Sequence, residues 1–206
     1  MQKIIDYIKQ QYDPTTIIIY GSYADGSNNA HSDFDALIIS NNQIKIHDTS
    51  FIDNVQLDVF VYPSSYFTEN IEYNQFLQIF DGVVIMDVDG YGRLLKNKVT
   101  DYVYNIAQKT YEEIYDEIKW CEKMLLRTRR NDAEGMFRWH WLLTESLQIY
   151  CDLKHHAYLG PKKSLLWMEK EHPDAFECYR NAIFEFNFIS TQKWINYLID
   201  VLMNYR

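Results

Sequence analysis

Three aspartates and a Gly-Ser pair have the types and spacing that suit phosphate chemistry. Gly21-Ser22 stands ten residues before Asp33-x-Asp35. A glycine turn lets the backbone approach a ligand closely, and N–H groups in such a turn can receive phosphate oxygens. Residues two apart on a strand point to the same face, so Asp33 and Asp35 would lie side by side, where a hard divalent cation relieves their repulsion. The pattern therefore predicts a phosphate cradle beside a metal site.

Apolar runs on both sides of this stretch predict the strands that position it. A β-branched run predicts a buried strand over about 16–20, and a second strand is expected over 33–40. A helix over about 22–29 would follow the Gly-Ser turn. A third strand over 55–62 alternates polar and apolar residues and carries Asp58. Because Asp is depleted in strands, aspartates at these places indicate a use beyond structure.

The Gly21-Ser22 pair, the Asp33-x-Asp35 pair and the later strand aspartate Asp58 follow one another in order. With these three motifs, the N-terminal half resembles the polymerase-β-like nucleotidyltransferase superfamily. Flanking residues that fit its bacterial small-substrate branch are Ala24, Gly26 and Ser32. That branch includes the kanamycin, streptomycin and lincosamide nucleotidyltransferases, and the minimal nucleotidyltransferases that pair with helical partner proteins.

The resemblance implies an enzyme that uses Mg²⁺, with two ions as one option, and moves AMP or another NMP from an NTP to a hydroxyl group. Asp33, Asp35 and Asp58 would hold the metal, and Gly21 and Ser22 would hold the β- and γ-phosphates. The resemblance gives the third carboxylate two roles. It is a metal ligand in polymerase-like members, and it deprotonates the attacking hydroxyl in several antibiotic-modifying relatives.

The second half of the chain has a helical period throughout. Helices are expected over 93–129, 132–153, 162–171, 174–187 and 190–204, which together predict an antiparallel bundle. The fold class is therefore α+β, with a small mixed sheet flanked by helices and a C-terminal helical bundle. The domains would be a nucleotidyltransferase domain over 1–95 and a helical bundle over 96–206, joined inside a connecting helix. The kanamycin- and streptomycin-modifying enzymes have the same layout.

A few charged residues of the helical half are candidates for the site. Glu145 lies in an otherwise apolar stretch, so it is either on an exposed face or aimed at a cleft. The kanamycin nucleotidyltransferase uses a helical-domain glutamate as its general base, and the resemblance offers Glu145 or Glu134 for that part. Lys162 and Lys163 begin a helix after Gly-Pro, where they are either solvated or bound to a triphosphate. The site is expected in a cleft between the sheet and the helical half, lined by acidic and aromatic side chains.

The composition of the chain indicates which kinds of molecule it binds. The 206 residues carry a formal net charge of −9, which makes the chain a poor general binder of nucleic acid and a better host for cationic small molecules. The same charge also serves ordinary solubility. The three cysteines are far apart and predict no disulfide or zinc framework. No apolar run is long enough for a membrane span, so we expect a soluble, cytoplasmic monomer or homodimer without nucleic-acid or membrane partners.

The leading functional prediction is transfer of AMP to a small hydroxyl-bearing acceptor, with an aminoglycoside-like antibiotic as one candidate and antibiotic resistance as the corresponding role. One alternative is a protein adenylyltransferase of antitoxin type. Another is a nucleotide-binding module that has lost turnover, which the intact Asp33, Asp35 and Asp58 disfavour. The acceptor and the preferred nucleotide are left open by the sequence.

Overall fold

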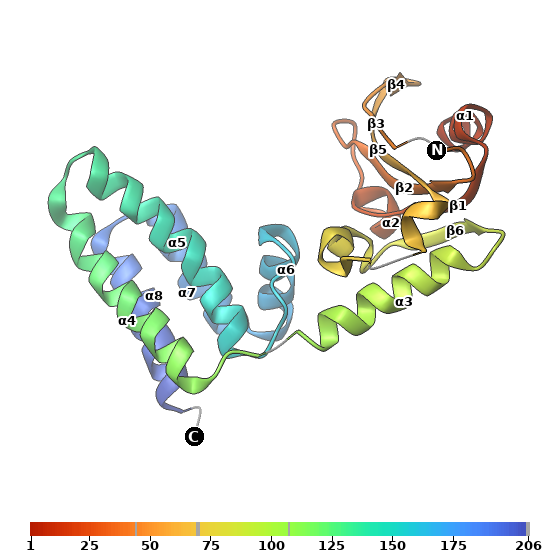
Figure 1. Cartoon of the computed structure of the whole chain (residues 1–206). Coiled ribbons are helices and arrows are strands. Elements are labelled where there is room, and N and C mark those ends of the chain that lie inside the picture. The colour runs from red at the N-terminus through yellow and green to blue at the C-terminus, as the bar shows by residue number, and fades with distance from the viewer. Residues whose placement is uncertain (44, 69–70, 107, 205–206) are drawn as a thin grey trace. The chain divides into compact units, whose positions relative to one another are not determined.

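The computed structural model describes residues 1–43, 45–68, 71–106 and 108–204. The chain divides into two compact units, residues 1–105 and 106–206, and each is described by itself below (Figure 1). Residue 95, where the sequence places the end of the first domain, lies inside helix α3 (Tyr91–Tyr104). All of α3 belongs to the first unit.

The first unit is built on a mixed six-stranded sheet with the order β3-β5-β2-β1-β6, and β4 pairs with β5 outside this path. The strands are β1 (Pro14–Ile19), β2 (Phe34–Ser40), β3 (Ile46–Asp48), β4 (Phe51–Ile52), β5 (Val55–Pro63) and β6 (Val83–Asp87). β2 and β5 run parallel, whereas the other pairs are antiparallel. The predicted α+β class with a small mixed sheet is confirmed. β3 and β4 were not expected, because three and two residues are too few to show a period.

Both faces of the sheet are covered. Helix α1 (Gln2–Tyr12) packs its isoleucines on one face, against Ile17, Ile38 and Val59. Helix α3 and two 3₁₀ helices, η1 (Ser64–Phe67) and η2 (Tyr73–Ile79), cover the other face (Figure 1). β1 and β2 are therefore buried on both sides, which explains their continuous β-branched and aliphatic runs.

The short strand β3 is held in place by the buried carboxylate of Asp48. The Tyr12 hydroxyl donates to Asp48 Oδ2 over 2.7 Å, and the Ser50 N–H donates to Oδ1 over 2.9 Å. Burial alone would raise the pKa of Asp48, but the hydrogen bonds from Ser50, Tyr12 and Tyr7 outweigh it and lower the pKa. Asp48 thus ties β3 to α1 across 36 residues of sequence.

The prediction of one helix over 93–129 is wrong, because the chain forms two helices there. α3 ends at Tyr104, and α4 (Tyr111–Arg127) begins after a capping box. In that box Thr110 accepts from the Glu113 N–H, and the Glu113 carboxylate accepts from the Thr110 N–H over 2.7 Å. Such a box satisfies the orphan N–H groups of a new helix, so it starts one even though the apolar period continues across the break.

The second unit is all helical among the residues that the structure describes. Its elements are α4, η3 (Thr128–Arg130), α5 (Ala133–Leu153), α6 (Pro161–Glu171), α7 (Pro173–Glu185) and α8 (Phe188–Met203). α4 and α5 pack side by side, and α7 packs on α8 (Figure 1). The core centres on Trp194, whose indole N–H donates to Ser146 Oγ over 2.9 Å. None of the described helices combines the length and the apolar character that crossing a membrane requires.

Asp87 joins the sheet to α3 inside the first unit. Its side chain is 1% exposed and accepts hydrogen bonds from Thr16 Oγ1, the Gly92 N–H and the Arg93 N–H at 2.9–3.1 Å. Burial alone would raise the pKa of Asp87, but these hydrogen bonds outweigh it and lower the pKa below its ordinary value of 3.8. The carboxylate satisfies the first N–H groups of α3, as capping residues do.

Replacing Asp87 by Ala should lower the free energy of unfolding by about 2 kcal/mol at pH 7, because two helix N–H groups lose a buried acceptor. A carboxyl group with a lowered folded pKa stabilises the protein above its unfolded pKa and loses that effect as the pH falls through the folded pKa. The difference between wild type and Asp87→Ala should therefore shrink below about pH 3.8. Urea unfolding at pH 7, 5 and 3 measures it, with the exposed Asp89→Ala as control. A difference that persists unchanged at pH 3 would contradict the assignment.

Candidate functional site

The turn after β1 brings the backbone against a carboxylate. Gly21 has φ +64° and ψ −151°, and a Cβ built on it would overlap Oδ2 of Asp35 and lie 3.0 Å from its Cγ. A non-glycine residue would therefore be strained by its own backbone and would also collide with Asp35. Gly21 therefore lies directly against Asp35, one of the two aspartates of the motif.

Asp35 and Asp58 come together through strand register. β2 and β5 run parallel with Asp35 opposite Asp58, two residues that are 23 apart in sequence. Neighbouring strands lie about 4.8 Å apart, so directly opposed side chains on one face are neighbours. Leu57 and Val59, on either side of Asp58, point into the core with exposures of 1% and 0%. Two carboxylates therefore stand side by side at the end of the sheet where both strands begin.

Tyr20, the residue directly after β1, continues this row. Its N–H donates to the Asp35 carbonyl over 3.1 Å, and the residue is 6% exposed. The pKa of Tyr20 is raised, first because the ring is buried and then because the negative charges of Asp58 and Asp35 disfavour a phenolate. The phenol therefore stays neutral beside two carboxylates.

Asp33 precedes β2 instead of belonging to it. The strand begins at Phe34, and Asp33 is exposed in the connection before it. The helix predicted over 22–29 is also shorter than expected, because α2 (Ser22–Asp25) ends at Gly26 with φ +77°. Within the described part of the chain, no three His, Cys, Asp or Glu side chains gather closely enough to hold a metal ion. The metal set of Asp33, Asp35 and Asp58 stays a prediction, and Asp35 and Asp58 are the pair that the register brings together.

A histidine that sequence reasoning missed lies beside Asp58. His47 on β3 places Nε2 2.6 Å from Asp58 Oδ1, and its ring stacks on Phe60 with centroids 4.2 Å apart. The row on this face therefore runs from Tyr20, the residue after β1, through Asp35 on β2 and Asp58 on β5 to His47 on β3. The only sequence signal was a lone histidine in a segment too short to show a strand period.

Glu145 lines a small pocket within the helical unit. The pocket has a volume of about 150 Å³, and its lining residues are Lys109, Glu117, Trp120, Trp141, Glu145, Gln148 and Ile149. The rings of Trp120 and Trp141 meet edge to face with centroids 5.1 Å apart. Glu145 is half-buried, and its carboxylate makes no hydrogen bond or ion pair with any described residue. The other candidate base, Glu134, is held by Arg138 over 3.0 Å and by Arg130 over 3.1 Å.

Lys109 supplies the positive charge at this pocket. Its ammonium pairs with Glu117 and lies 2.8 Å from Asp152 Oδ2. Burial alone would lower the pKa of Lys109, but the bonds to Asp152 and Glu117 outweigh it and raise the pKa. With Glu145 included, carboxylates outnumber the one ammonium, so the pocket is negative overall.

Lys162 and Lys163 occupy the first turn of α6, directly after Gly160-Pro161, as the sequence predicted. Both belong to the helical unit. Their assignment to the nucleotide, and the expected cleft between sheet and bundle, stay predictions.

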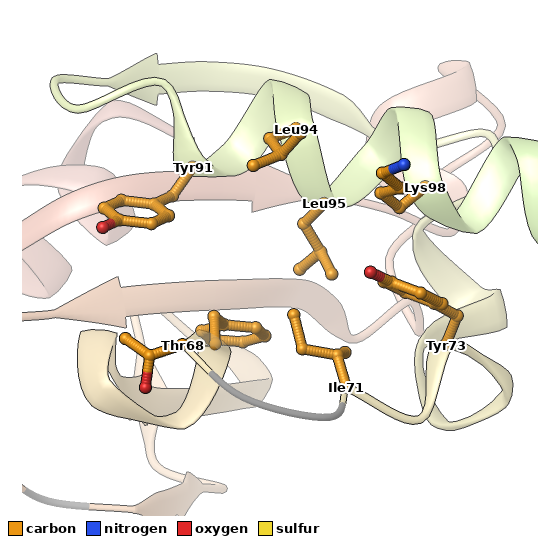
Figure 2. Close-up of a pocket in the computed structure, with 8 residues that line it drawn as sticks. Thr68, Ile71, Tyr73, Tyr91, Leu94, Leu95 and Lys98 are labelled. Carbon is orange, nitrogen blue, oxygen red and sulfur yellow. The ribbon is translucent and has the colours of Figure 1, made fainter.

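A larger pocket in the first unit involves none of the predicted site residues. It has a volume of about 470 Å³ and lies between α3 and the 3₁₀ segments, with Leu95 and Lys98 above and Ile71 and Tyr73 below (Figure 2). Its residue Tyr91 follows the end of β6 that pairs with the start of β1, whereas Gly21 follows the end of β1. The pocket therefore lies toward the opposite end of the sheet from the paired carboxylates.

The fold and the site together define an α+β domain suited to phosphate-group chemistry, with paired carboxylates beside a glycine turn. A family profile described as "Nucleotidyltransferase domain" matches residues 1–126, more than half of the chain. The chain belongs to this family, and it is an enzyme of the nucleotidyltransferase class that uses a nucleoside triphosphate. The superfamily resemblance is thereby confirmed.

The comparison with solved structures also matches a nucleotidyltransferase-like protein from Exiguobacterium sibiricum 255-15. It is 11% identical with a TM-score of 0.48, and the comparison covers 98% of this chain and 74% of that chain. No curated protein matches the chain.

Replacing Gly21 by Ala should abolish nucleotidyl transfer, because the new Cβ displaces the Asp35 carboxylate. The matched control is Gly26→Ala, where the added Cβ has no atom within 4 Å and the cost is limited to about 1 kcal/mol of backbone strain. Transfer is measured by mass spectrometry as the addition of a nucleoside monophosphate to an acceptor, and circular dichroism verifies folding. Full activity in a folded Gly21→Ala protein would show that the close approach to Asp35 is not needed.

Proposed function

We propose that this enzyme transfers AMP from ATP to a hydroxyl group of a small cationic molecule in a Mg²⁺-dependent reaction. The observation that carries the proposal is the pairing of Asp35 with Asp58 on parallel strands, with Gly21 pressed against Asp35. Two carboxylates at one end of a sheet and a backbone that admits no side chain are what a triphosphate and its cation require.

The donor set fits a hard divalent cation. Asp35 and Asp58 offer carboxylate oxygens, the ligands that Mg²⁺ prefers, and the exposed Asp33 lies two residues before Asp35 to supply a third. When bound, the ion supplies positive charge that neutralises the triphosphate and the charge developing at the α-phosphorus. The pairing of β2 with β5 fixes the positions of Asp35 and Asp58.

The remaining contacts to the nucleotide come from backbone and basic groups. Gly21 and Ser22 would hold the β- and γ-phosphates through the turn after β1, and Lys162 and Lys163 are the proposed basic partners from the helical unit. The transfer then forms one bond from the acceptor oxygen to the α-phosphorus and breaks the bond from the α-phosphorus to the pyrophosphate oxygen. Positioning and electrostatics account for most of the rate enhancement in such a reaction.

The acceptor hydroxyl must lose its proton, and two residues are proposed for that role. Asp58 is at the paired carboxylates, and Glu145 is a half-buried carboxylate in the helical pocket. The pocket also supports the cationic nature of the acceptor, because its carboxylates outnumber the Lys109 ammonium and Trp120 and Trp141 offer aromatic faces. An amino sugar of aminoglycoside type combines hydroxyl and ammonium groups in this way.

Replacing Asp35 or Asp58 by Asn should reduce transfer at least a thousandfold, because each change removes a charge that would neutralise the cation. The assay is a mass-spectrometric search for AMP adducts on a panel of aminoglycosides and lincosamides, with ATP and Mg²⁺. Calorimetry of ATP binding with and without Mg²⁺ should show metal-dependent binding that weakens in both variants. Asp89→Asn is the matched control in the same unit. Turnover near the wild-type rate in either folded variant would refute the proposal, and adducts on protein would favour the protein adenylyltransferase instead.

Replacing Glu145 by Gln separates the two candidate bases. If Glu145 is the base, kcat should fall about 10²- to 10⁴-fold while the affinity for ATP is unchanged. If Glu145 only binds the ammonium of the acceptor, KM for the acceptor should rise and kcat should persist. The exposed Glu112→Gln on α4 is the control. Wild-type kcat and KM in Glu145→Gln would exclude the pocket from acceptor recognition.

A further inference from the structure

His47 contacts Asp58 from the neighbouring strand with two constraints on its ring. Nε2 lies 2.6 Å from Asp58 Oδ1, and the imidazole lies nearly parallel to the Phe60 ring, with an interplanar angle of 4°. The stacking fixes the plane of the ring, and the hydrogen bond fixes its rotation. Together, the stacking and the hydrogen bond hold the imidazole in one orientation.

The register of the β3–β5 pair brings His47 close to Asp58. His47 is paired with Phe60 on the antiparallel β3–β5 ladder, and Asp58 lies two residues before Phe60 on the same face. The next residue, Asp48, is buried and tied to Tyr12 and Ser50. The backbone that carries His47 is therefore anchored to α1 and not only to the edge of the sheet.

The direction of the bond follows from the chemistry of its partners. An ionised carboxylate has only acceptor oxygens, so the proton in this contact is on Nε2 of His47, which donates to Oδ1. No other hydrogen bond to the Asp58 carboxylate is found among the described residues. Oδ2 is thus left for another ligand while Oδ1 is held.

We propose that His47 is a positioning residue that orients Asp58 for nucleotidyl transfer. This inference rests on the proposed function, in which Asp58 is a metal ligand or a base. Carboxylates that bind metal are commonly oriented by a hydrogen bond from a second residue, and loss of that residue typically costs 10- to 100-fold in metal affinity or activity. An ordinary surface ion pair would contribute little, and its loss would leave both quantities unchanged.

The test compares two substitutions of His47. His47→Phe keeps an aromatic ring on Phe60 and removes the donor, whereas His47→Gln restores an amide donor near the position of Nε2. Mn²⁺ binding, followed by electron paramagnetic resonance with and without ATP, is the readout that does not depend on an acceptor. We expect His47→Phe to weaken Mn²⁺ binding about tenfold and to lower kcat by 10- to 100-fold at unchanged KM for ATP, and His47→Gln to recover most of both.

The matched control is His140→Phe in the helical unit, because His140 also stacks on a phenylalanine, Phe186, but has no carboxylate bond among the described residues. Wild-type Mn²⁺ binding and kcat in His47→Phe, or no recovery in His47→Gln, would overturn the inference. Tighter Mn²⁺ binding in His47→Phe would also overturn it, since His47 would then hold Asp58 away from the ion.

The same measurements on Asp58→Asn distinguish this inference from the function on which it rests. If Asp58→Asn loses Mn²⁺ binding while His47→Phe retains it, the role of Asp58 stands and that of His47 fails. If Asp58→Asn retains both Mn²⁺ binding and turnover, the proposed role of Asp58 fails. The double variant His47→Phe/Asp58→Asn should bind Mn²⁺ no more weakly than Asp58→Asn alone, because His47 acts only through Asp58.

Discussion

The parallel pairing of β2 with β5 is the contact on which the candidate site depends. Its register places Asp35 opposite Asp58, and the same register buries Leu57 and Val59 on the other face. A slip of one residue would move Leu57 and Val59 to the face that carries the site and would move Asp58 into the core against α1. Apolar burial on the other face of β5 therefore fixes where the two carboxylates lie.

The neighbouring carboxylates of Asp35 and Asp58 repel each other, and their surroundings reduce this repulsion. The Asp58 side chain is 38% exposed, so water screens the pair, and His47 donates a hydrogen bond from the outer side of the row. On the inner side, Gly21 leaves room for Asp35, and Tyr20 stays neutral because burial and the two charges raise its pKa. The arrangement is suited to a cation that enters from solvent and relieves what repulsion remains.

In the helical unit, acidic side chains are neutralised by ion pairs with basic side chains of the same unit. Lys109 neutralises the half-buried Glu117 and Asp152, and two arginines neutralise the exposed Glu134. Glu145 has no such partner among the described residues, although it is half-buried beside the two tryptophans of the pocket. This lack of an internal partner is the reason that Glu145 is proposed for acceptor recognition or proton removal.

The sequence alone determined the local features of this protein. The spacing of Gly21, Asp35 and their flanking apolar runs specified a turn between two buried strands, and the helical period specified the second half. It misjudged the connection between the units, because an apolar period continues across the break while the Thr110–Glu113 capping box starts a new helix. Only the tertiary structure decided that Asp58 stands opposite Asp35 and that His47 reaches Asp58. Those contacts join strands whose order and register are set by packing against α1 and α3, and no short-range pattern in the chain encodes which strands become neighbours.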